Sequence, residues 1–481
     1  MNDFVINIKK VMLVFLILFI ALISYISYFY IFNSEKIVAS TFNNRLWAER
    51  NKVLRGTIYD KDMVALTKST KIDATSQKVK YLGGEAFTHA IGYIDPVYGL
   101  TGLEKKYDAE LMGNQSDVSK FFSFGTDEEE KVGNSLKTTL DSKLQKVAFD
   151  SLSKSEIKGG GKVKGSVVAL NPKTGEILAM VSMPTYDPNN LARDWETILA
   201  NKDMPLLNRA VSGLYPPGSI FKTITAISAL ENIPDVYNRK FEDNGKLVFN
   251  ESSSLENFGG EANGNIDFKY AFVNSSNVVF GTLGIDLGNN ALKETAEKFY
   301  FNKDTPAQGL TIENSRFPSY KSNEKGNIAQ SAIGQSGVLA SPMEMALVAS
   351  TIANDGIMMQ PMLVSEILDS KGKSIKKIEP KLLEETMSKQ TAQTMKDLMK
   401  EVVSDGTGTN AAVSGITVCG KTGTADHNDA DGKAMQAHSW FISFAPYDNP
   451  QIAIAVIVEE GGVGGVEAAR ITQDMISAYL K

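Results

Sequence analysis

The chain has 481 residues, 43% of them hydrophobic, and a formal net charge of −6 at pH 7. This length exceeds one domain of about 100–200 residues, and the acidic balance argues against a nucleic-acid-binding protein, which usually carries a basic stripe. Three histidines and one cysteine are too few for a zinc site of the usual ligand count, and a single cysteine excludes an intrachain disulfide.

The N-terminal segment predicts a membrane anchor. Residues 11–32 carry no charged side chain, and a bilayer core needs roughly 20 apolar residues. A cleavable signal peptide is the alternative, because Val-Ala-Ser at 38–40 resembles a cleavage site, but its apolar region would usually span only about 7–15 residues. Lys9 and Lys10 before the span favour a cytoplasmic N-terminus. We therefore expect a cytoplasmic tail (1–10), a single transmembrane helix (11–33) in the cell membrane, and an extracytoplasmic remainder.

Residues 34–150 are expected to form a small module of mixed helices and strands. An acidic run at 126–131 predicts a solvated loop within it. Residues 140–152 place their apolar side chains at helical spacing, which predicts a helix near the end of the module. A glycine-rich stretch at 158–162 then predicts a flexible join to the rest of the chain.

The pattern changes at Gly165. Apolar strand candidates occur in two pairs, at 165–172 with 176–184 and at 439–445 with 451–458. Long helical stretches lie between the pairs, including 219–230 and 342–353. Strands at both ends with helices between them predict one sheet covered by helices, an α/β or α+β domain over residues 151–481.

The first chemically suggestive motif is Ser219-x-x-Lys222. Residues three apart share a helix face, so the Lys222 amine can lie beside the Ser219 hydroxyl. A serine is a weak nucleophile until a base takes its proton, and a lysine can be that base where burial lowers its pKa. Pro216-Pro217-Gly218 precedes a mostly apolar helix, which predicts a buried helix start with free backbone N–H groups near Ser219. The alternative is that Ser219 serves only as an N-cap.

The second motif, Lys421–Thr424, lies just before the C-terminal strand pair. An edge strand there would direct Lys421 and Thr422 toward a carboxylate, and Gly423 would let a substrate backbone approach closely. The motif alone is ambiguous, because the same Lys-Thr-Gly triplet at 173–175 predicts only a hairpin turn.

The third motif is Ser275-Ser276-Asn277, which follows an apolar and aromatic stretch. A loop hydroxyl and amide at this point could relay a proton and orient a substrate amide. Each motif is weak alone, but in this chain order the three resemble the serine-active penicillin-recognising family, with S-x-x-K, S-x-N and K-T-G.

The resemblance covers most of the chain. Tyr215–Ser219 is similar to the segment before the family's nucleophile, and Gly406–Thr409 is similar to its glycine-threonine segment. Arg55–Asp60 and Gly102–Asp108 resemble signatures of the class B, monofunctional branch. The chain is therefore identified as a member of the class B penicillin-binding proteins, which implies a penicillin-recognising transpeptidase fold behind a small pedestal module. It departs from the family in an extra residue at 334–337 and in a short N-terminal module.

The resemblance implies a serine D-Ala-D-Ala transpeptidase that cross-links peptidoglycan. Ser219 would attack the penultimate D-alanine carbonyl of a wall stem peptide, and Lys222 would accept the hydroxyl proton. Ser275 would return a proton to the departing D-alanine. The backbone N–H groups of Ser219 and Thr424 would form the oxyanion hole.

The same resemblance implies the binding residues and the partners. Asn277 would hold the donor's amide, and the terminal carboxylate would contact the β-strand motif of Lys421, Thr422, Gly423 and Thr424. β-Lactams would acylate Ser219. Neither a metal nor an organic cofactor is expected. A membrane-embedded glycan polymerase is the expected protein partner.

Three rival functions share this resemblance. One is a β-lactamase or D,D-carboxypeptidase, in which water resolves the acyl-enzyme. The others are a β-lactam sensor and a non-catalytic scaffold. Outside the motifs, Cys419 is expected to be a small core residue, and His427 and His438 are expected to have a structural or surface role rather than to touch substrate.

Overall fold

The computed structural model describes residues 2–38, 47, 50–73, 75–113, 131–157, 160–428 and 432–481. Residues 39–40 of the alternative cleavage site, 126–130 of the acidic run and 158–159 of the glycine-rich join lie outside this set.

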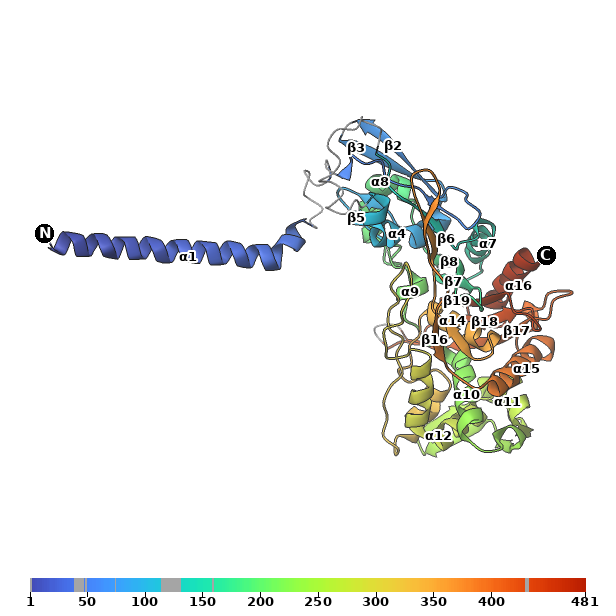
Figure 1. Cartoon of the computed structure of the whole chain (residues 1–481). Helices are drawn as coiled ribbons and strands as arrows, with labels where there is room; N and C mark the ends of the chain where they lie inside the picture. The colour runs from blue at the N-terminus through green and yellow to red at the C-terminus, as the bar shows by residue number, and fades with distance from the viewer. Residues whose placement is uncertain are drawn as a thin grey trace.

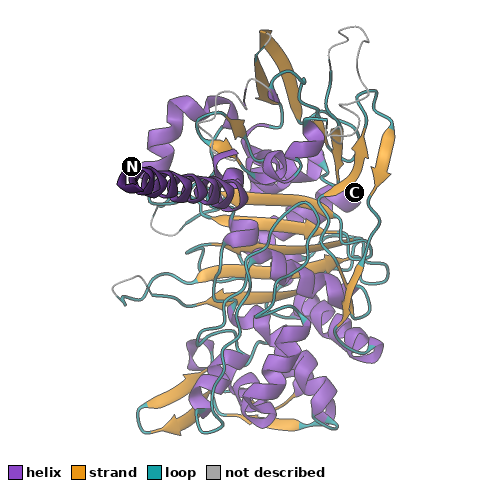
Figure 2. Cartoon of the chain, turned by 60° about the vertical axis from the view of Figure 1, so that its left-hand side comes forward, coloured by secondary structure: helices purple, strands orange, loops and turns teal. Residues whose placement is uncertain are grey.

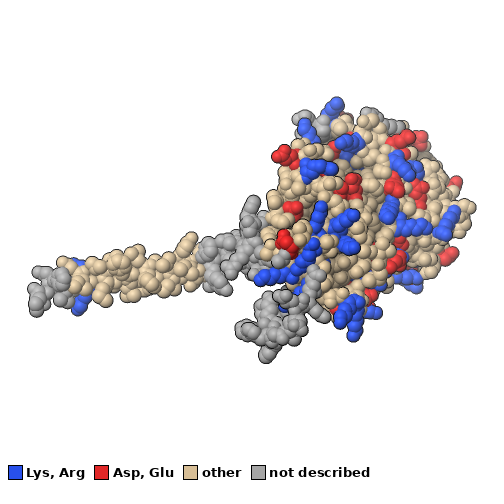
Figure 3. All heavy atoms as spheres, turned by 90° about the horizontal axis from the view of Figure 1, so that it is seen from above, with Lys and Arg blue, Asp and Glu red and all other residues tan. Residues whose placement is uncertain are grey.

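A long apolar helix, α1 (Asn2–Val38), opens the chain and extends away from the body in Figure 1. Its segment Ile6–Tyr28 has a mean hydropathy of 2.6 and buries none of its window against the protein. The helix is therefore long and apolar enough to cross a membrane. Figure 3 shows the described part of this helix as tan apart from basic side chains near its outer end, whereas both signs of charge are interspersed over the body.

The module after the anchor shares a sheet with the distant part of the chain. Strand β1 (Ile58–Tyr59) pairs in parallel with β6 (Ser135–Thr138), and β6 pairs with β14 (Val364–Leu368). A hairpin of β2 (Thr67–Asp73) and β3 (Ser76–Tyr81) projects beside it (Figure 1). Strands from both sides of the expected boundary at residue 150 thus contribute to one sheet.

A buried ion pair holds the two class B signatures together. Arg55 Nε lies 2.6 Å from Glu104 Oε2, and both side chains are 1% exposed. Arg55 also bonds Asp108 at 2.7 Å, and Asp108 accepts a second ion pair from Arg50. Glu104 belongs to helix α4 (Gly102–Lys106), so the two sequence segments meet at one charged cluster.

The larger domain is built on a five-stranded sheet in the order β17-β18-β19-β7-β8, with every neighbouring pair antiparallel. Its strands are β7 (Gly165–Leu170), β8 (Ile177–Met183), β17 (Cys419–Ala425), β18 (His438–Ala445) and β19 (Ile452–Val458). Every residue of β18 and β19 is buried. Continuous burial explains the uninterrupted apolar run of β19 and the mostly apolar sequence of β18, because both faces of the sheet are covered.

Helices cover the two faces of this sheet (Figure 2). Helices α7 (Ser142–Ser153) and α16 (Glu467–Leu480) share one hydrophobic core with the strands. Helix α14 (Pro342–Ala353) belongs to the core on the other face, and all its residues are buried. The predicted sheet covered by helices is confirmed, and the helix predicted at 342–353 has the same bounds as α14.

A group of helices lies beside the edge strand β17 and completes the cleft described below (Figure 1). Its members are α10 (Lys222–Asn232), α11 (Phe268–Val273), α12 (Asn277–Lys298), α13 (Lys325–Ala332) and α15 (Lys389–Asp405). The α-helix predicted at 219–230 begins later than expected. The first residues of the predicted helix belong to a separate 3-10 turn, η3 (Gly218–Phe221), and the α-helix begins only at Lys222.

Candidate active site

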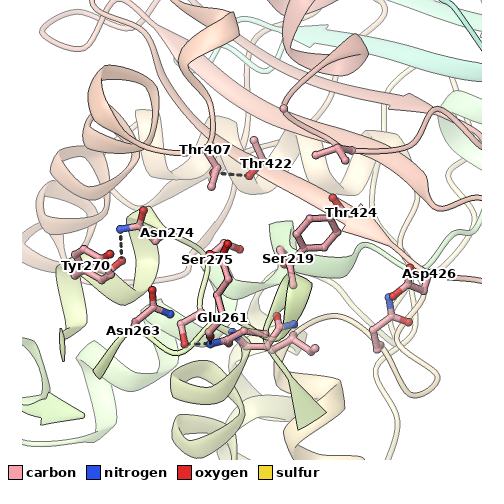
Figure 4. A pocket seen from close by; sticks show the side chains of 18 residues that line it. Ser219, Glu261, Asn263, Tyr270, Asn274, Ser275, Thr407, Thr422, Thr424 and Asp426 are labelled. Atoms are coloured by element: carbon pink, nitrogen blue, oxygen red, sulfur yellow. Dashed lines mark hydrogen bonds between the residues drawn. The ribbon is translucent and has the colours of Figure 1, made fainter. Parts of the chain in front are cut away.

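A cleft of about 370 Å³ lies between β17 and the loop that joins α11 to α12. Ser219, Ser275, Asn277, Thr422 and Thr424 all line it. Figure 4 shows Ser219, Ser275 and Thr424 around the same space, each supplied by a different element. The structure thus brings together motifs that are more than 50 residues apart in the sequence.

The nucleophile candidate Ser219 lies in η3, directly beneath β17. Residues three apart eclipse in a 3-10 turn, so Ser219 and Lys222 point to the same side. The N-cap position of this turn is occupied by Pro217, not by Ser219, and no side chain caps the turn with a hydrogen bond. The interpretation of Ser219 as an N-cap is therefore wrong.

The turn is held tightly against β17. Gly218 has φ +55°, and a Cβ atom there would come within 2.5 Å of the Thr424 carbonyl oxygen. A Cβ on Gly423 would meet Ile220 Cγ2 at 2.9 Å and the Pro217 carbonyl oxygen at 3.0 Å. Gly423 is therefore needed for packing against η3, and it is not among the residues that line the cleft in the described chain.

Lys222 is fully buried directly behind the cleft. Its Nζ donates to the Ser275 carbonyl oxygen at 2.6 Å, to Ser275 Oγ at 3.1 Å and to Asn277 Oδ1 at 2.7 Å. Burial lowers the pKa of Lys222 well below its ordinary value, and the nearby Lys421 cation lowers it further. A neutral amine has only two N–H groups, so in that form Lys222 donates to the Ser275 carbonyl and to Asn277 Oδ1 while the Ser275 hydroxyl donates to it. With its pKa lowered, the amine is suited to act as a base in this neutral form.

No hydrogen bond joins Lys222 to the Ser219 hydroxyl within residues 160–428. Catalytic hydrogen bonds are often loose before substrate binds, so the shared orientation is the more informative observation.

Lys421 is the second fully buried amine of the site. Its Nζ donates to Ser275 Oγ at 3.0 Å and to the Thr422 carbonyl oxygen at 3.2 Å. Burial lowers the pKa of Lys421 to about 7. Ser275 has φ +59°, a left-handed conformation that costs a non-glycine residue roughly 1–3 kcal/mol. The strained conformation thus occurs at the residue whose hydroxyl contacts the amines of both Lys222 and Lys421.

Hydroxyl groups form the wall of the cleft along β17. The Thr407 and Thr422 hydroxyls lie 2.6 Å apart, and Thr424 Oγ1 accepts the Gly464 N–H at 3.3 Å. Thr407 was not predicted as a site residue, although the segment that contains it is part of the resemblance. Carboxylates bind well to such a combination of hydroxyls and a nearby cation.

Several other cleft residues had no signal in the sequence. Asn257, Glu261, Asn263 and Tyr270 line the side opposite β17. Asn257, Glu261 and Asn263 lie in loops and Tyr270 lies on α11, none of them in a recognisable motif, and only the tertiary fold brings them to the cleft. Gln335 also lines it and precedes Ser336, which has φ +51° in the segment with the extra residue.

The single cysteine and the two nearby histidines lie outside the cleft lining of the described chain. Cys419 is fully buried, and burial raises the pKa of its thiol. His427 and His438 stack on each other with ring centroids 3.9 Å apart. The stacking supports structural roles for both rings.

Comparison with known proteins identifies the family. The model described as the penicillin binding protein transpeptidase domain matches residues 165–477, and the penicillin binding protein A dimerisation domain matches residues 55–136. The chain belongs to the class B penicillin-binding proteins. Residues 165–477 include all three motifs, so the resemblance drawn from the sequence is confirmed.

Relatives of this penicillin-binding protein are similar to it over nearly its whole length. It is 33% identical over 470 residues to the peptidoglycan D,D-transpeptidase PbpA of Mycolicibacterium smegmatis, with 94% of each chain covered. The ceftriaxone acyl-enzyme of penicillin-binding protein A from M. tuberculosis superposes with a TM-score of 0.83 at 30% identity, covering 90% of this chain and 100% of that one. The D,D-transpeptidase domain of a peptidoglycan glycosyltransferase from Eggerthella lenta gives 0.78 at 33% identity, covering 89% and 98%. The predicted transpeptidase fold is confirmed.

Proposed function

We propose that this protein is a peptidoglycan D,D-transpeptidase that works through an acyl-enzyme on Ser219. The observation that carries the proposal is the burial of Lys222 behind Ser219, with its amine held by Ser275 and Asn277 and its pKa lowered. A neutral amine at this point can take the hydroxyl proton as Ser219 attacks a carbonyl carbon.

In the acylation step, Ser219 Oγ bonds to the penultimate D-alanine carbonyl of a stem peptide while its proton passes to Lys222. The backbone N–H groups of Ser219 and Thr424 stabilise the resulting oxyanion, and one such donor is typically worth about 10²–10³ in rate. Ser275 then passes a proton from Lys222 to the nitrogen of the departing D-alanine. The hydrogen bond from Lys222 Nζ to Ser275 Oγ at 3.1 Å supports this route.

The β17 side of the cleft binds the donor peptide. Lys421 neutralises the terminal carboxylate, and Thr422 and Thr424 donate hydroxyl hydrogen bonds to it. Thr407, 2.6 Å from Thr422, orients that hydroxyl. Asn277 holds the donor's amide. An amine of a neighbouring stem peptide then attacks the acyl-enzyme, which forms the cross-link and frees Ser219.

β-Lactams imitate the donor and acylate Ser219 by the same route. The related penicillin-binding protein A from M. tuberculosis has been captured as ceftriaxone, imipenem and penicillin G acyl-enzymes, which supports this assignment.

We propose a single-pass topology, with Lys9 and Lys10 in the cytoplasm and the catalytic domain outside. In this arrangement residues 34–150 form the pedestal and residues 151–481 the transpeptidase domain. A membrane-embedded glycan polymerase is the proposed partner, which would supply the strands to be cross-linked.

The test separates acyl transfer from hydrolysis. The purified protein is incubated with a thioester donor whose transferred acyl residue is D-alanine, with and without a D-amino acid as the acceptor amine. A transpeptidase converts the donor to the aminolysis product in an acceptor-dependent manner, and Ser219→Ala abolishes the product. Hydrolysis that is unaffected by the acceptor would instead assign a D,D-carboxypeptidase.

A further inference from the structure

A buried carboxylate lies behind the Ser275–Asn277 loop, outside the three motifs. Asp243 ends strand β9 (Lys240–Asp243) and is fully buried. It accepts hydrogen bonds from the Gly245 N–H at 3.0 Å, the Asn257 amide at 2.7 and 2.9 Å, the Asn263 amide at 2.8 Å and the Ser276 hydroxyl at 2.7 Å. Such a set of donors is what a buried ionised carboxylate needs.

Asn257 connects Asp243 to the Ser275–Asn277 loop. Its Nδ2 group must face Asp243, because a carboxylate can only accept, and the same Nδ2 donates to the Glu261 carbonyl oxygen at 2.8 Å. Its Oδ1 is therefore directed at the loop, where it accepts the backbone N–H groups of Asn277 at 2.8 Å and Val278 at 3.1 Å. These N–H groups lie in the first turn of α12, where backbone N–H groups have no acceptor within the helix.

Ser276 makes the second connection. Its hydroxyl donates to Asp243 and accepts the Val279 N–H at 3.1 Å, so it also caps α12. Asp243 therefore fixes the residues on both sides of the peptide bond that joins Ser276 to Asn277. Ser275, which precedes them with φ +59°, is the residue that binds both buried amines. A strained backbone of this kind persists only where its surroundings hold it.

Charge supports the same relationship. The charged groups that face Lys222 are Lys421 on β17, which favours the neutral amine, and Asp243 on β9, which favours the charged one. Asp243 thus offsets part of the cost of burying Lys222 beside another cation.

We propose that Asp243 is a positioning residue for acylation, which acts through Ser276 and Asn257 to hold Ser275 and Asn277 against Lys222. This inference rests on the proposed function. Asp243 lies 32 residues before Ser275 in the chain and carries no sequence motif, so only the folded structure points to it.

The test compares Asp243→Asn with Asp267→Asn in the full-length protein. Asp267 lies on β12 (Gly264–Asp267), which pairs with β9, and caps α11 from a solvent-accessible position. Asparagine caps helices as well as aspartate does, so this control changes the same charge without touching the network. Thermal unfolding of both variants shows whether each remains folded.

We expect Asp243→Asn to lower the acylation rate constant for penicillin G by about tenfold or more, because small displacements of catalytic groups are costly. The binding constant for the unreacted antibiotic should change less than the rate constant, since Thr422 and Thr424 are untouched and only the contact with Asn277 is weakened. Loss of the negative charge lowers the pKa of Lys222 further, so the pH midpoint of acylation should move to lower pH. A folded Asp243→Asn variant with wild-type acylation, or one that slows with an unmoved midpoint, would overturn the proposal.

Asn257→Ala is the second variant if Asp243→Asn fails to fold. It removes the connection to the Asn277 N–H but leaves Asp243 with Ser276, Asn263 and Gly245. It should slow acylation in the same way, and wild-type acylation would again overturn the proposal. Absence of acylation in the wild-type protein would instead contradict the proposed function itself.

Discussion

The Nζ atoms of Lys222 and Lys421 meet at one hydroxyl group. Ser275 Oγ lies 3.1 Å from the first and 3.0 Å from the second, and both lysines are fully buried. Two buried amines around one hydroxyl cannot both keep their charge at low cost, because each disfavours the charged form of the other. In the proposed mechanism this relationship supplies a neutral base and a cation in one cleft.

Replacing Lys222 by methionine removes the amine but keeps the volume of the side chain. We expect acylation by penicillin to fall by about 10²–10⁴-fold, the usual contribution of general acid–base catalysis. The variant should remain folded, because a buried amine is itself costly. Stopped-flow acylation and thermal unfolding measure the two effects. Lys293→Ala on the exposed part of α12 is the control, and equal losses in both variants would contradict a catalytic role for Lys222.

The pH dependence of acylation should follow the two lysines with opposite signs. Lys222 acts as a base when neutral, so its lowered pKa keeps acylation active far below the ordinary pKa of a lysine. In the proposed mechanism Lys421 binds a carboxylate when protonated, so the second-order rate constant should decline as pH rises through about 7. Lys421→Ala should be slower and lack this decline. The same decline in Lys421→Ala would assign it to another group.

Gly218→Ala should displace η3, the turn that carries Ser219, and slow acylation. A Cβ there would lie 2.5 Å from the Thr424 carbonyl oxygen, so η3 and β17 must move apart. We expect a loss of about 10²-fold in acylation, since displacements of about 1 Å reach that size. Gly372→Ala is the matched control, because Gly372 also has a positive φ, +80°, but open space around it. Acylation rates of the two variants decide the matter: similar rates would contradict a requirement for the close approach between Gly218 and β17.

The buried pair of Arg55 and Glu104 should matter for stability rather than for chemistry. Arg55→Ala leaves the buried Glu104 carboxylate without its partner, and breaking such a pair typically costs about 3–5 kcal/mol. Denaturant unfolding measures the loss. Arg193→Ala breaks an exposed pair with Asp194 and should change stability far less, because water screens such a pair. The account of the pedestal would be wrong if the two substitutions had equal effects.

The sequence predicted those parts of the molecule that depend on local pattern. The strands β18 and β19 and the helix α14 follow from predominantly apolar stretches, and α7 follows from the helical spacing of the apolar residues at 140–152. The three motifs, too, were found from their residues and order, and they meet in one cleft.

What the sequence did not predict depends on distant contacts. The 3-10 turn at Ser219 exists because β17 packs against Gly218, more than 200 residues away in the chain. Asp243 and Asn257 became recognisable only through their hydrogen bonds to Ser276 and Asn277. The pairing of β6 with β14 likewise joins segments separated by more than 220 residues, which no local pattern specifies.

The most direct test of the central claim is the intact mass of the purified protein after incubation with penicillin G, with Ser219→Ala beside the wild type. The account predicts a stable adduct of one penicillin on the wild-type chain, located by peptide mapping to Ser219, and no adduct on the variant. An adduct that persists in Ser219→Ala, or a folded wild-type protein that forms none, would contradict it.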